Sequence, residues 1–204
     1  MKYATALRQL VTIGEAATDD IRLRDTSIGY PLQELWVGGD VLEGLQELDE
    51  TCVVLVLDRP VTEVTWLALN PAGESIAERL RMTKLPIRWY CRPAAYPAWN
   101  PDTRKVVRFW SAATQLAREV MENLRLRRFD SLPVVCPSDD QLMSQLAIEA
   151  VDCRRHLRHV LDHYWDGSWR REHRGFGIQP EDHLWRASEA VREIEDAMAQ
   201  IGSQ

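Results

Sequence analysis

Hydrophobic positions in the first 135 residues alternate between helical and extended spacing. Apolar side chains three and four residues apart predict a first helix over residues 2–17. Short apolar runs predict four strands, over residues 32–38, 51–57, 87–92 and 104–110. Helical spacing returns between these runs and predicts helices over residues 72–83 and 112–128. This part of the chain is therefore expected to form an α/β-type domain.

The pattern changes after residues 130–137, where prolines interrupt it. Two apolar seams with steps of four and three residues then predict two long helices around 146–164 and 184–201, which suit antiparallel pairing. We expect a first domain over 1–135, with a small mixed sheet and flanking helices. A second domain over 137–201 is expected to be an antiparallel helical hairpin packed on it. The predicted fold class is α+β.

The composition is that of a globular protein. Of the 204 residues, 45% are hydrophobic and 27% are charged, which argues against a disordered chain. The longest strongly apolar run, residues 52–57, is far too short to span a membrane, and the first residues lack the apolar core of a signal peptide. The four cysteines are too widely spaced for a zinc knuckle or a redox pair. We expect a soluble cytoplasmic protein without a membrane partner, disulfide or cofactor.

Charge is distributed unevenly along the chain, although the net charge is only −6. Residues 1–58 contain 4 Lys/Arg and 11 Asp/Glu, whereas residues 79–128 contain 12 Lys/Arg and 3 Asp/Glu. Either these segments neutralise each other within the fold, or the basic segment forms a surface that binds phosphate groups. Nucleic acid is not favoured as the ligand, because domains that bind it are usually basic overall.

One stretch of the chain carries a motif with a known structural context. The first predicted strand ends in Gly38-Gly39, and Asp40, Asp49 and Glu50 lie between it and the next apolar strand. This succession of a helix, a strand with a small-residue end and acidic residues entering a strand resembles the nucleotidyltransferase fold. The resemblance implies a glycine turn that lets the backbone approach a nucleotide triphosphate. It also implies carboxylates at the start of the next strand and on a later strand, which hold divalent metal.

The carboxylates that this resemblance requires are incomplete. A pair two residues apart would occupy positions 49 and 51 or positions 50 and 52, so only Asp49 or only Glu50 contributes an acid. The later strands over 87–92 and 104–110 contain no acid. A single carboxylate cannot organise two metal ions, so we expect a core without catalytic activity. The alternatives are an unusual active site using Asp40, Asp49 and Glu50, or an unrelated α/β domain with a Gly-Gly turn.

The chain as a whole resembles members of a family of uncharacterised proteins. The similar segments are Glu34–Leu42, Pro60–Trp66, Val107–Trp110 and His183–Ala187. They extend over most of the chain, and none of them is a specific catalytic signature. The resemblance therefore implies a family and leaves the activity open.

Two predicted strands, over 87–92 and 104–110, carry arginines at alternating positions. Within each strand, the arginines therefore lie on the same face. If the strands are neighbours, these arginines and Tyr90 form one platform for a phosphorylated ligand beside the glycine turn. The residues expected to contact such a ligand are Gly38, Gly39, Arg88, Arg92, Arg104 and Arg108. The alternative is that the arginines pair with the acidic segments.

Acids and histidines gather on one side of the first long helix. The members of this group are Glu149, Asp152, His156, His159 and His163. Imidazoles and carboxylates are ligands of transition metals, so the candidate metal ligands are Asp152, His156, His159 and His163. The alternative is a solvated helix flank.

The connection between the two long helices, residues 166–179, is long for a helical hairpin. It combines arginines with aromatic residues and glycines, which suits contacts with phosphate or with a partner. Alternatively, Trp169 and Phe176 enter the core and leave the arginines in solvent.

Together these features predict a non-catalytic binding or regulatory protein on a nucleotidyltransferase-like core. Its partner would be another protein or a phosphorylated ligand. The alternatives are an active nucleotidyltransferase with an unusual metal site, or one component of a toxin–antitoxin-like or host-defence pair.

Overall fold

The computed structural model describes residues 1–23, 31–49, 51–175 and 177–203 of the chain. The chain divides into two compact units. The sheet unit consists of Met1–Arg59 and Pro71–Pro137, and the helical unit consists of Pro60–Asn70 and Ser138–Gln204. Independent domains over 1–135 and 137–201 stay a prediction, because compactness alone does not show which part folds by itself.

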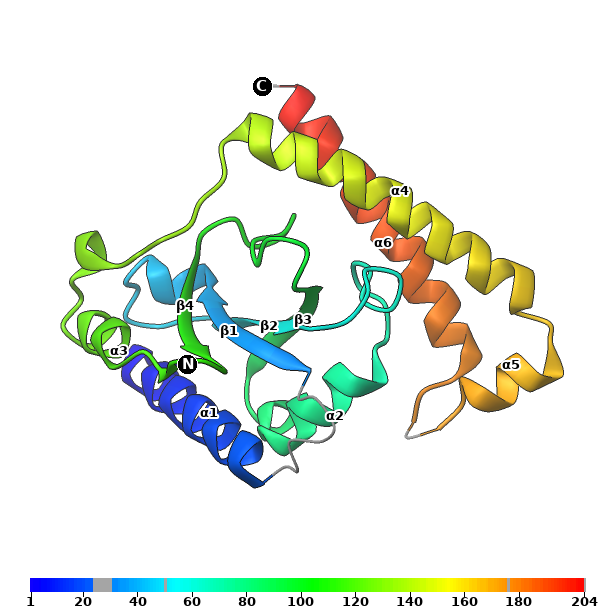
Figure 1. Ribbon diagram of the computed structural model, residues 1–204. Coiled ribbons are helices and arrows are strands. Elements are labelled where there is room, and N and C mark those ends of the chain that lie inside the picture. The colour runs from blue at the N-terminus through cyan, green and yellow to red at the C-terminus, as the bar shows by residue number, and fades with distance from the viewer. Residues whose placement is uncertain (24–30, 50, 176, 204) are drawn as a thin grey trace. The chain divides into compact units, whose positions relative to one another are not determined.

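Within the described residues, five strands form one mixed sheet in the order β3-β2-β1-β4-β5 (Figure 1). Their bounds are β1 Leu32–Gly38, β2 Thr51–Leu57, β3 Ile87–Pro93, β4 Val106–Ser111 and β5 Gln115–Leu116. Strands β2 and β3 run parallel, and the other neighbours run antiparallel. Every residue of β2 is buried, in agreement with its continuous apolar run. The predicted mixed sheet is confirmed.

The helices of the sheet unit flank this sheet, as predicted. They are α1 Tyr3–Leu23, α2 Pro71–Arg79 and α3 Arg118–Arg125, with the 3-10 helices η1 Gly39–Leu42, η2 Met82–Lys84 and η3 Phe129–Ser131. The helix predicted over 112–128 is wrong in its first part, because Gln115–Leu116 pair with the end of β4. The Ser111 hydroxyl accepts the backbone N–H of Thr114 at 3.1 Å, and Gln115 has a φ of 63°. This left-handed residue closes a tight turn and cannot belong to an α-helix.

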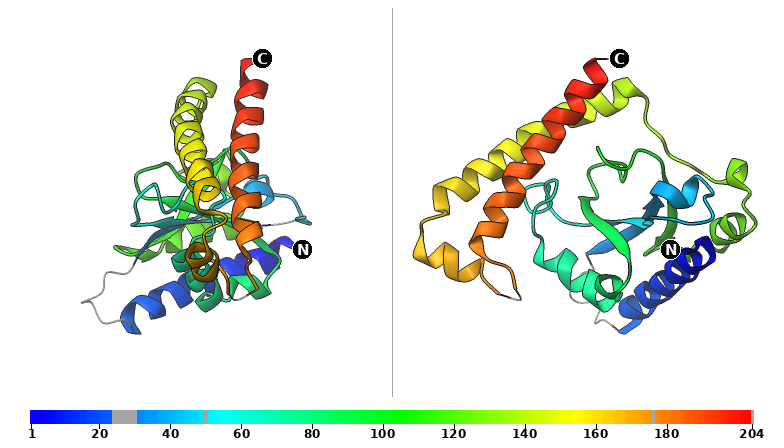
Figure 2. Two further views of the ribbon diagram at one scale, coloured as in Figure 1. Left: turned by 90° about the vertical axis from the view of Figure 1, so that its right-hand side faces the viewer. Right: turned by 180° about the vertical axis from the view of Figure 1, so that it is seen from behind.

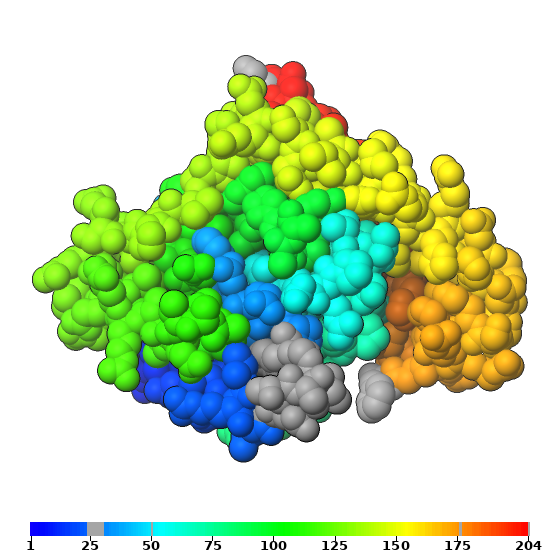
Figure 3. All heavy atoms as spheres, in the orientation of Figure 1, coloured from blue at the N-terminus to red at the C-terminus, as the bar shows by residue number. Residues whose placement is uncertain are grey.

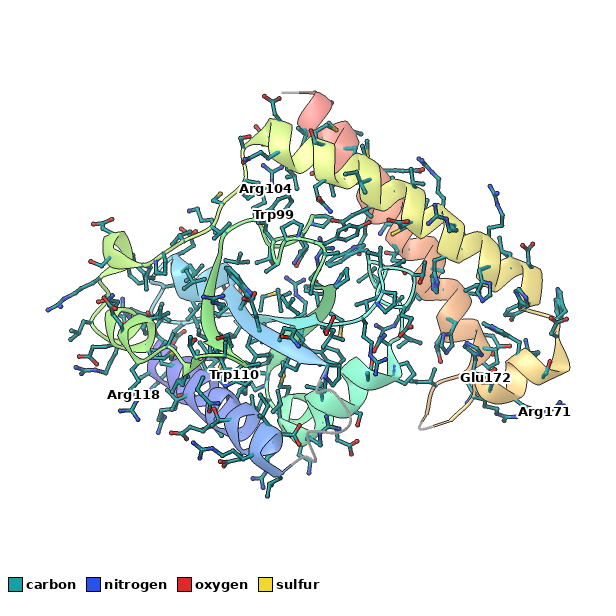
Figure 4. The ribbon with its side chains drawn as sticks, viewed as in Figure 1. Trp99, Arg104, Trp110, Arg118, Arg171 and Glu172 are labelled. Carbon is teal, nitrogen blue, oxygen red and sulfur yellow. The ribbon has the colours of Figure 1, made fainter. Side chains whose placement is uncertain are left out.

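The two faces of the sheet have different neighbours. On one face, α1 and α2 lie against the sheet (Figure 2). Trp110 (Figure 4) donates its indole N–H to Thr18 of α1 at 3.0 Å, and Gly73 of α2 packs against Cys91. A Cβ at Gly73 would lie only 2.2 Å from the Cys91 sulfur, so this packing requires glycine. The opposite face, here called the aromatic face, carries Cys52, Val54, Val56 and Val106 together with Trp36, Tyr90 and Trp99.

The helical unit contains the predicted helical pair. Its helices are α4 Asp139–His163, α5 Gly167–Glu172 and α6 Pro180–Gly202. Side-chain hydrogen bonds from Arg154 to Glu195 and from Tyr164 to Glu181 show that α4 and α6 run antiparallel. In the described part of the chain, no helix is long and apolar enough to cross a membrane.

Two segments of the helical unit differ from the sequence prediction. The short helix α5 lies in the connection that was expected to be a loop, and its Trp169 is buried against Val160 and Ala187. The predicted core position of Trp169 is thus confirmed, whereas Phe176 lies outside the described residues. The segment Pro60–Asn70 groups with the helices, because the buried indole of Trp66 donates its N–H to Glu193 of α6 at 2.9 Å.

Candidate ligand-binding site

The register of the sheet gathers arginines on the aromatic face, because directly paired residues of neighbouring strands point to the same side. The pairs across β2 and β3 are Cys52–Arg88, Val54–Tyr90 and Val56–Arg92. Trp36 of β1 pairs with Val54 on one side and with Arg108 of β4 on the other. Arg88, Arg92 and Arg108 therefore share a face, as predicted. The prediction that β3 and β4 are neighbours is wrong, because β2 and β1 lie between them.

Two of these arginines form ion pairs within the sheet unit. The Arg88 guanidinium lies 2.5 Å from the Asp102 carboxylate, and Arg108 lies 2.5 Å from Glu34. Asp102 also accepts the hydroxyl of Tyr90 at 3.0 Å. Burial and the Asp102 carboxylate raise the pKa of Tyr90, so its phenol stays protonated and remains a donor.

The remaining two candidate arginines are placed differently. Arg92 is only 1% exposed, and its Nε donates to the Pro97 carbonyl at 3.0 Å. Its guanidinium lies 5.7 Å from the ring centroid of Tyr96, so it holds the loop that follows β3. Arg104 was expected on a strand but precedes β4, which begins at Val106; it lies on the same loop as Trp99 (Figure 4).

The glycine turn at the end of β1 is packed against the chain itself. Gly39 has a φ of 76°, a conformation that favours glycine. A Cβ at Gly38 would lie 2.3 Å from Cγ2 of Thr103 and 2.7 Å from the carbonyl oxygen of Lys105. The close approach that glycine permits here is therefore made by residues 103–105, in the space where the sequence predicts a phosphate.

The acidic candidates lie on the connection between β1 and β2. The Asp40 carboxylate accepts the backbone N–H of Asp49 at 3.1 Å, whereas Glu50 lies outside the described residues. At the start of β2, Cys52 faces the Thr103 hydroxyl, which lies 3.3 Å from its sulfur. In the register that puts the implied carboxylates at positions 50 and 52, the second position thus carries a thiol.

The aromatic face also contains a cavity that the sequence analysis missed. Its volume is about 210 Å³. It is lined by Glu34, Trp36, Val56, Ala94, Tyr96, Pro97, Ala98, Trp99, Val106 and Val135. The loop that bounds it lies at the surface of the sheet unit (Figure 3). The sequence signal for it is the proline-rich loop between two strands, which carries Tyr96 and Trp99. The structure brings these two residues and Trp36 of β1 to the same cavity.

One carboxylate lines this cavity, and both of its oxygens have partners. Glu34 accepts the indole N–H of Trp36 at 2.8 Å and the guanidinium of Arg108 at 2.5 Å. The first bond fixes the orientation of the indole, and the second balances the negative charge. The cavity therefore has rigid aromatic walls and little net charge.

The predicted metal candidates on α4 are not assembled into a cluster. Asp152 pairs with Arg155 at 2.9 Å, and the rings of His159 and His163 lie 4.4 Å apart at their centroids. Glu149 is buried and accepts the side-chain amide of Gln145 at 3.0 Å. Among the residues that the structure describes, no three His, Cys, Asp or Glu side chains are placed to hold a metal ion.

A different group of histidines meets around α5. His173 stacks on the indole of Trp169 with centroids 4.1 Å apart, and His183 of α6 lies 4.9 Å from His173. Burial and the other histidines lower the pKa of His183 to about 4 and also lower that of His156. The imidazoles of His183 and His156 are therefore neutral at neutral pH and act as packing groups.

A protein-family model described as a domain of unknown function, DUF7711, matches residues 1–200. The chain belongs to this family. The expected membership of an uncharacterised family is thus confirmed. No curated protein and no solved structure matches the chain. Because membership of DUF7711 assigns no activity, the function has to be argued from the site.

Proposed function

We propose that this protein is a non-catalytic binding protein built on a nucleotidyltransferase-like core. The order of elements supports the proposal, because α1 is followed by β1 with its terminal Gly38-Gly39 and then by the buried strand β2. That succession is what the resemblance implies.

The proposal depends on which side chains occupy the place where the resemblance implies metal-binding carboxylates. Cys52 pairs with Arg88 across β2 and β3, and Arg88 forms an ion pair with Asp102. A guanidinium at this position repels a divalent cation and neutralises the nearest carboxylate. Thr103 fills the space between Cys52 and Gly38. The arrangement suits a packed binding scaffold better than a two-metal centre.

A nucleotide-transfer assay tests this proposal. The protein is incubated with radiolabelled nucleoside triphosphates, Mg²⁺ or Mn²⁺, and protein and RNA acceptors. We expect no label above that of a reaction without protein. Transfer that Asp49→Ala abolishes and Asp58→Ala preserves would overturn the proposal. It would support an active nucleotidyltransferase that uses Asp40, Asp49 and Glu50.

The second candidate is favoured by one contact, the hydrogen bond between the Asp40 carboxylate and the Asp49 backbone. It brings two acidic residues together beside the glycine turn. The transfer assay with Asp49→Ala therefore decides between the two candidates.

A further inference from the structure

We propose that the cavity on the aromatic face binds a small aromatic carboxylate, with its ring between Trp36 and Trp99 and its carboxylate at Arg108. This inference rests on the proposed function, since it names the ligand class of a binding protein. It concerns a site separate from the glycine turn and from the Arg88–Asp102 ion pair.

The size and walls of the cavity select a planar apolar group. A cavity of about 150 Å³ already takes up benzene, so the 210 Å³ found here accommodates a larger, bicyclic ring. Trp36, Tyr96 and Trp99 provide aromatic surfaces, and Val56 provides an aliphatic one. Stacking on such rings favours a planar ligand.

The surrounding charges select against a cation. Aromatic cages bind cations through the faces of their rings, but here a guanidinium group already lies over one face of Trp36 and another over one face of Tyr96. Arg108 lies 6.0 Å from the ring centroid of Trp36, and Arg92 lies 5.7 Å from that of Tyr96. Glu34 is already balanced by Arg108. An entering ammonium group would therefore find guanidinium groups already on two of the rings and the lining carboxylate already paired.

Arg108 provides the anion site at the edge of the cavity. Its side chain is 47% exposed, although it contacts Glu34. A guanidinium has five N–H donors in a planar fork, so it can bind a ligand carboxylate while it keeps Glu34. Trp36 continues to hold the other oxygen of Glu34. The ligand would thus place its ring in the cavity and its carboxylate toward solvent.

Calorimetric titration of the full chain with three matched probes tests the inference. The probes share an indole ring and differ in charge: indole-3-acetate, indole and tryptamine. We expect indole-3-acetate to bind at least tenfold more tightly than tryptamine, with indole between them. Absence of binding by all three probes, or tighter binding of tryptamine than of indole-3-acetate, would overturn the inference.

Variants test the anion-binding arginine and the aromatic walls of the site separately. Arg108→Ala should reduce the affinity for indole-3-acetate to that for indole, and it should bind tryptamine better than the native protein does. Trp99→Ala should weaken all three probes at least fivefold, as expected for loss of one stacking surface. The matched control is Trp185→Ala, which removes an indole of α6 that is 68% exposed and should change no affinity.

A second variant covers the case in which Trp99→Ala does not fold. Val135→Trp places a large ring at the edge of the cavity, where the native side chain is 40% exposed. It should abolish binding of all three probes while the thermal transition is retained. Undiminished binding in this variant would exclude the cavity as the site. Failure of the proposed function appears separately, as nucleotide transfer in the transfer assay.

Discussion

At the scale of single residues, the uneven charge of the sequence is resolved mainly by pairing within the sheet unit. Among the described residues, ion pairs that join the acidic start of the chain to its basic middle include Arg79–Asp20, Lys105–Glu43 and Arg108–Glu34. A further basic residue, Arg92, is buried against a carbonyl and an aromatic ring. The basic segment therefore stabilises its own fold. Its capacity to bind an anion is concentrated at side chains that keep exposed surface, such as Arg108.

Replacement of Gly38 tests the packing of the glycine turn. In Gly38→Ala the new Cβ meets the Lys105 carbonyl, which is backbone and cannot rotate away. We expect the free energy of unfolding to fall by about 1–3 kcal/mol, the usual cost of overpacking, measured by urea denaturation. Gly202→Ala is the control, because a Cβ there meets no atom within 4 Å. Equal stability of the two variants would show that residues 103–105 do not pack as described.

The histidines around α5 predict a pH dependence of stability. Burial, followed by His173 and His156, lowers the pKa of His183 to about 4; Asp182 opposes this shift and Arg186 adds to it. In the unfolded chain His183 titrates near 6.5, so the unfolded state binds more protons between these two values. Stability from this group is therefore complete above about pH 6.5 and is lost as the pH falls toward 4.

The measurement is the thermal midpoint between pH 4 and pH 8 for the native chain and for His183→Gln. Glutamine cannot titrate, so the variant should lose less stability between pH 6.5 and pH 4 than the native protein does. Comparison at pH 8, where both side chains are neutral, gives the cost of the substitution itself. Parallel curves for the two proteins would contradict the prediction.

At the scale of elements, the sequence predicts those whose hydrophobic period is strong and uninterrupted. The apolar run of β2 and the heptad-like seams of α4 and α6 belong to this group. Prediction fails where a local turn determines the structure: β5 begins at Gln115, which has a left-handed backbone conformation, and α5 has only six residues. Such short elements exist because of tertiary contacts, which hydrophobic spacing does not record.

The start of α4 offers a test at this scale. The Ser138 hydroxyl accepts the Gln141 backbone N–H at 3.2 Å, and the Gln141 side chain accepts the Ser138 backbone N–H at 3.0 Å. This reciprocal cap predicts that Ser138→Ala lowers the free energy of unfolding by about 1 kcal/mol, measured by chemical denaturation. Ser188→Ala is the control, because that hydroxyl only bonds back to the Leu184 carbonyl within α6. A loss of equal size in both variants would argue against the cap.

At the scale of the whole molecule, the candidate site shows what a linear sequence can and cannot predict. The alternation of residues along β3 and β4 correctly predicts that Arg88, Arg92 and Arg108 lie on one face of the sheet. The strand order that separates them depends on long-range pairing, which alternation does not encode. The cavity requires Trp36 and the loop with Trp99 to meet across the sheet, so only the tertiary fold reveals it.

The last prediction concerns Trp66, which ties the segment Pro60–Asn70 to α6. The side chain is 2% exposed and donates its indole N–H to Glu193. Trp66→Ala should lower the free energy of unfolding by about 3–5 kcal/mol, because it removes a large buried side chain. Trp66→Phe keeps most of the apolar contact and loses the donor, so about 1 kcal/mol is expected. Far-UV circular dichroism during chemical denaturation measures both losses of stability.

The control is Trp185→Ala, whose free energy of unfolding should lie within about 0.5 kcal/mol of that of the native protein. If Trp66→Ala is as stable as this control, the helices do not depend on the segment Pro60–Asn70.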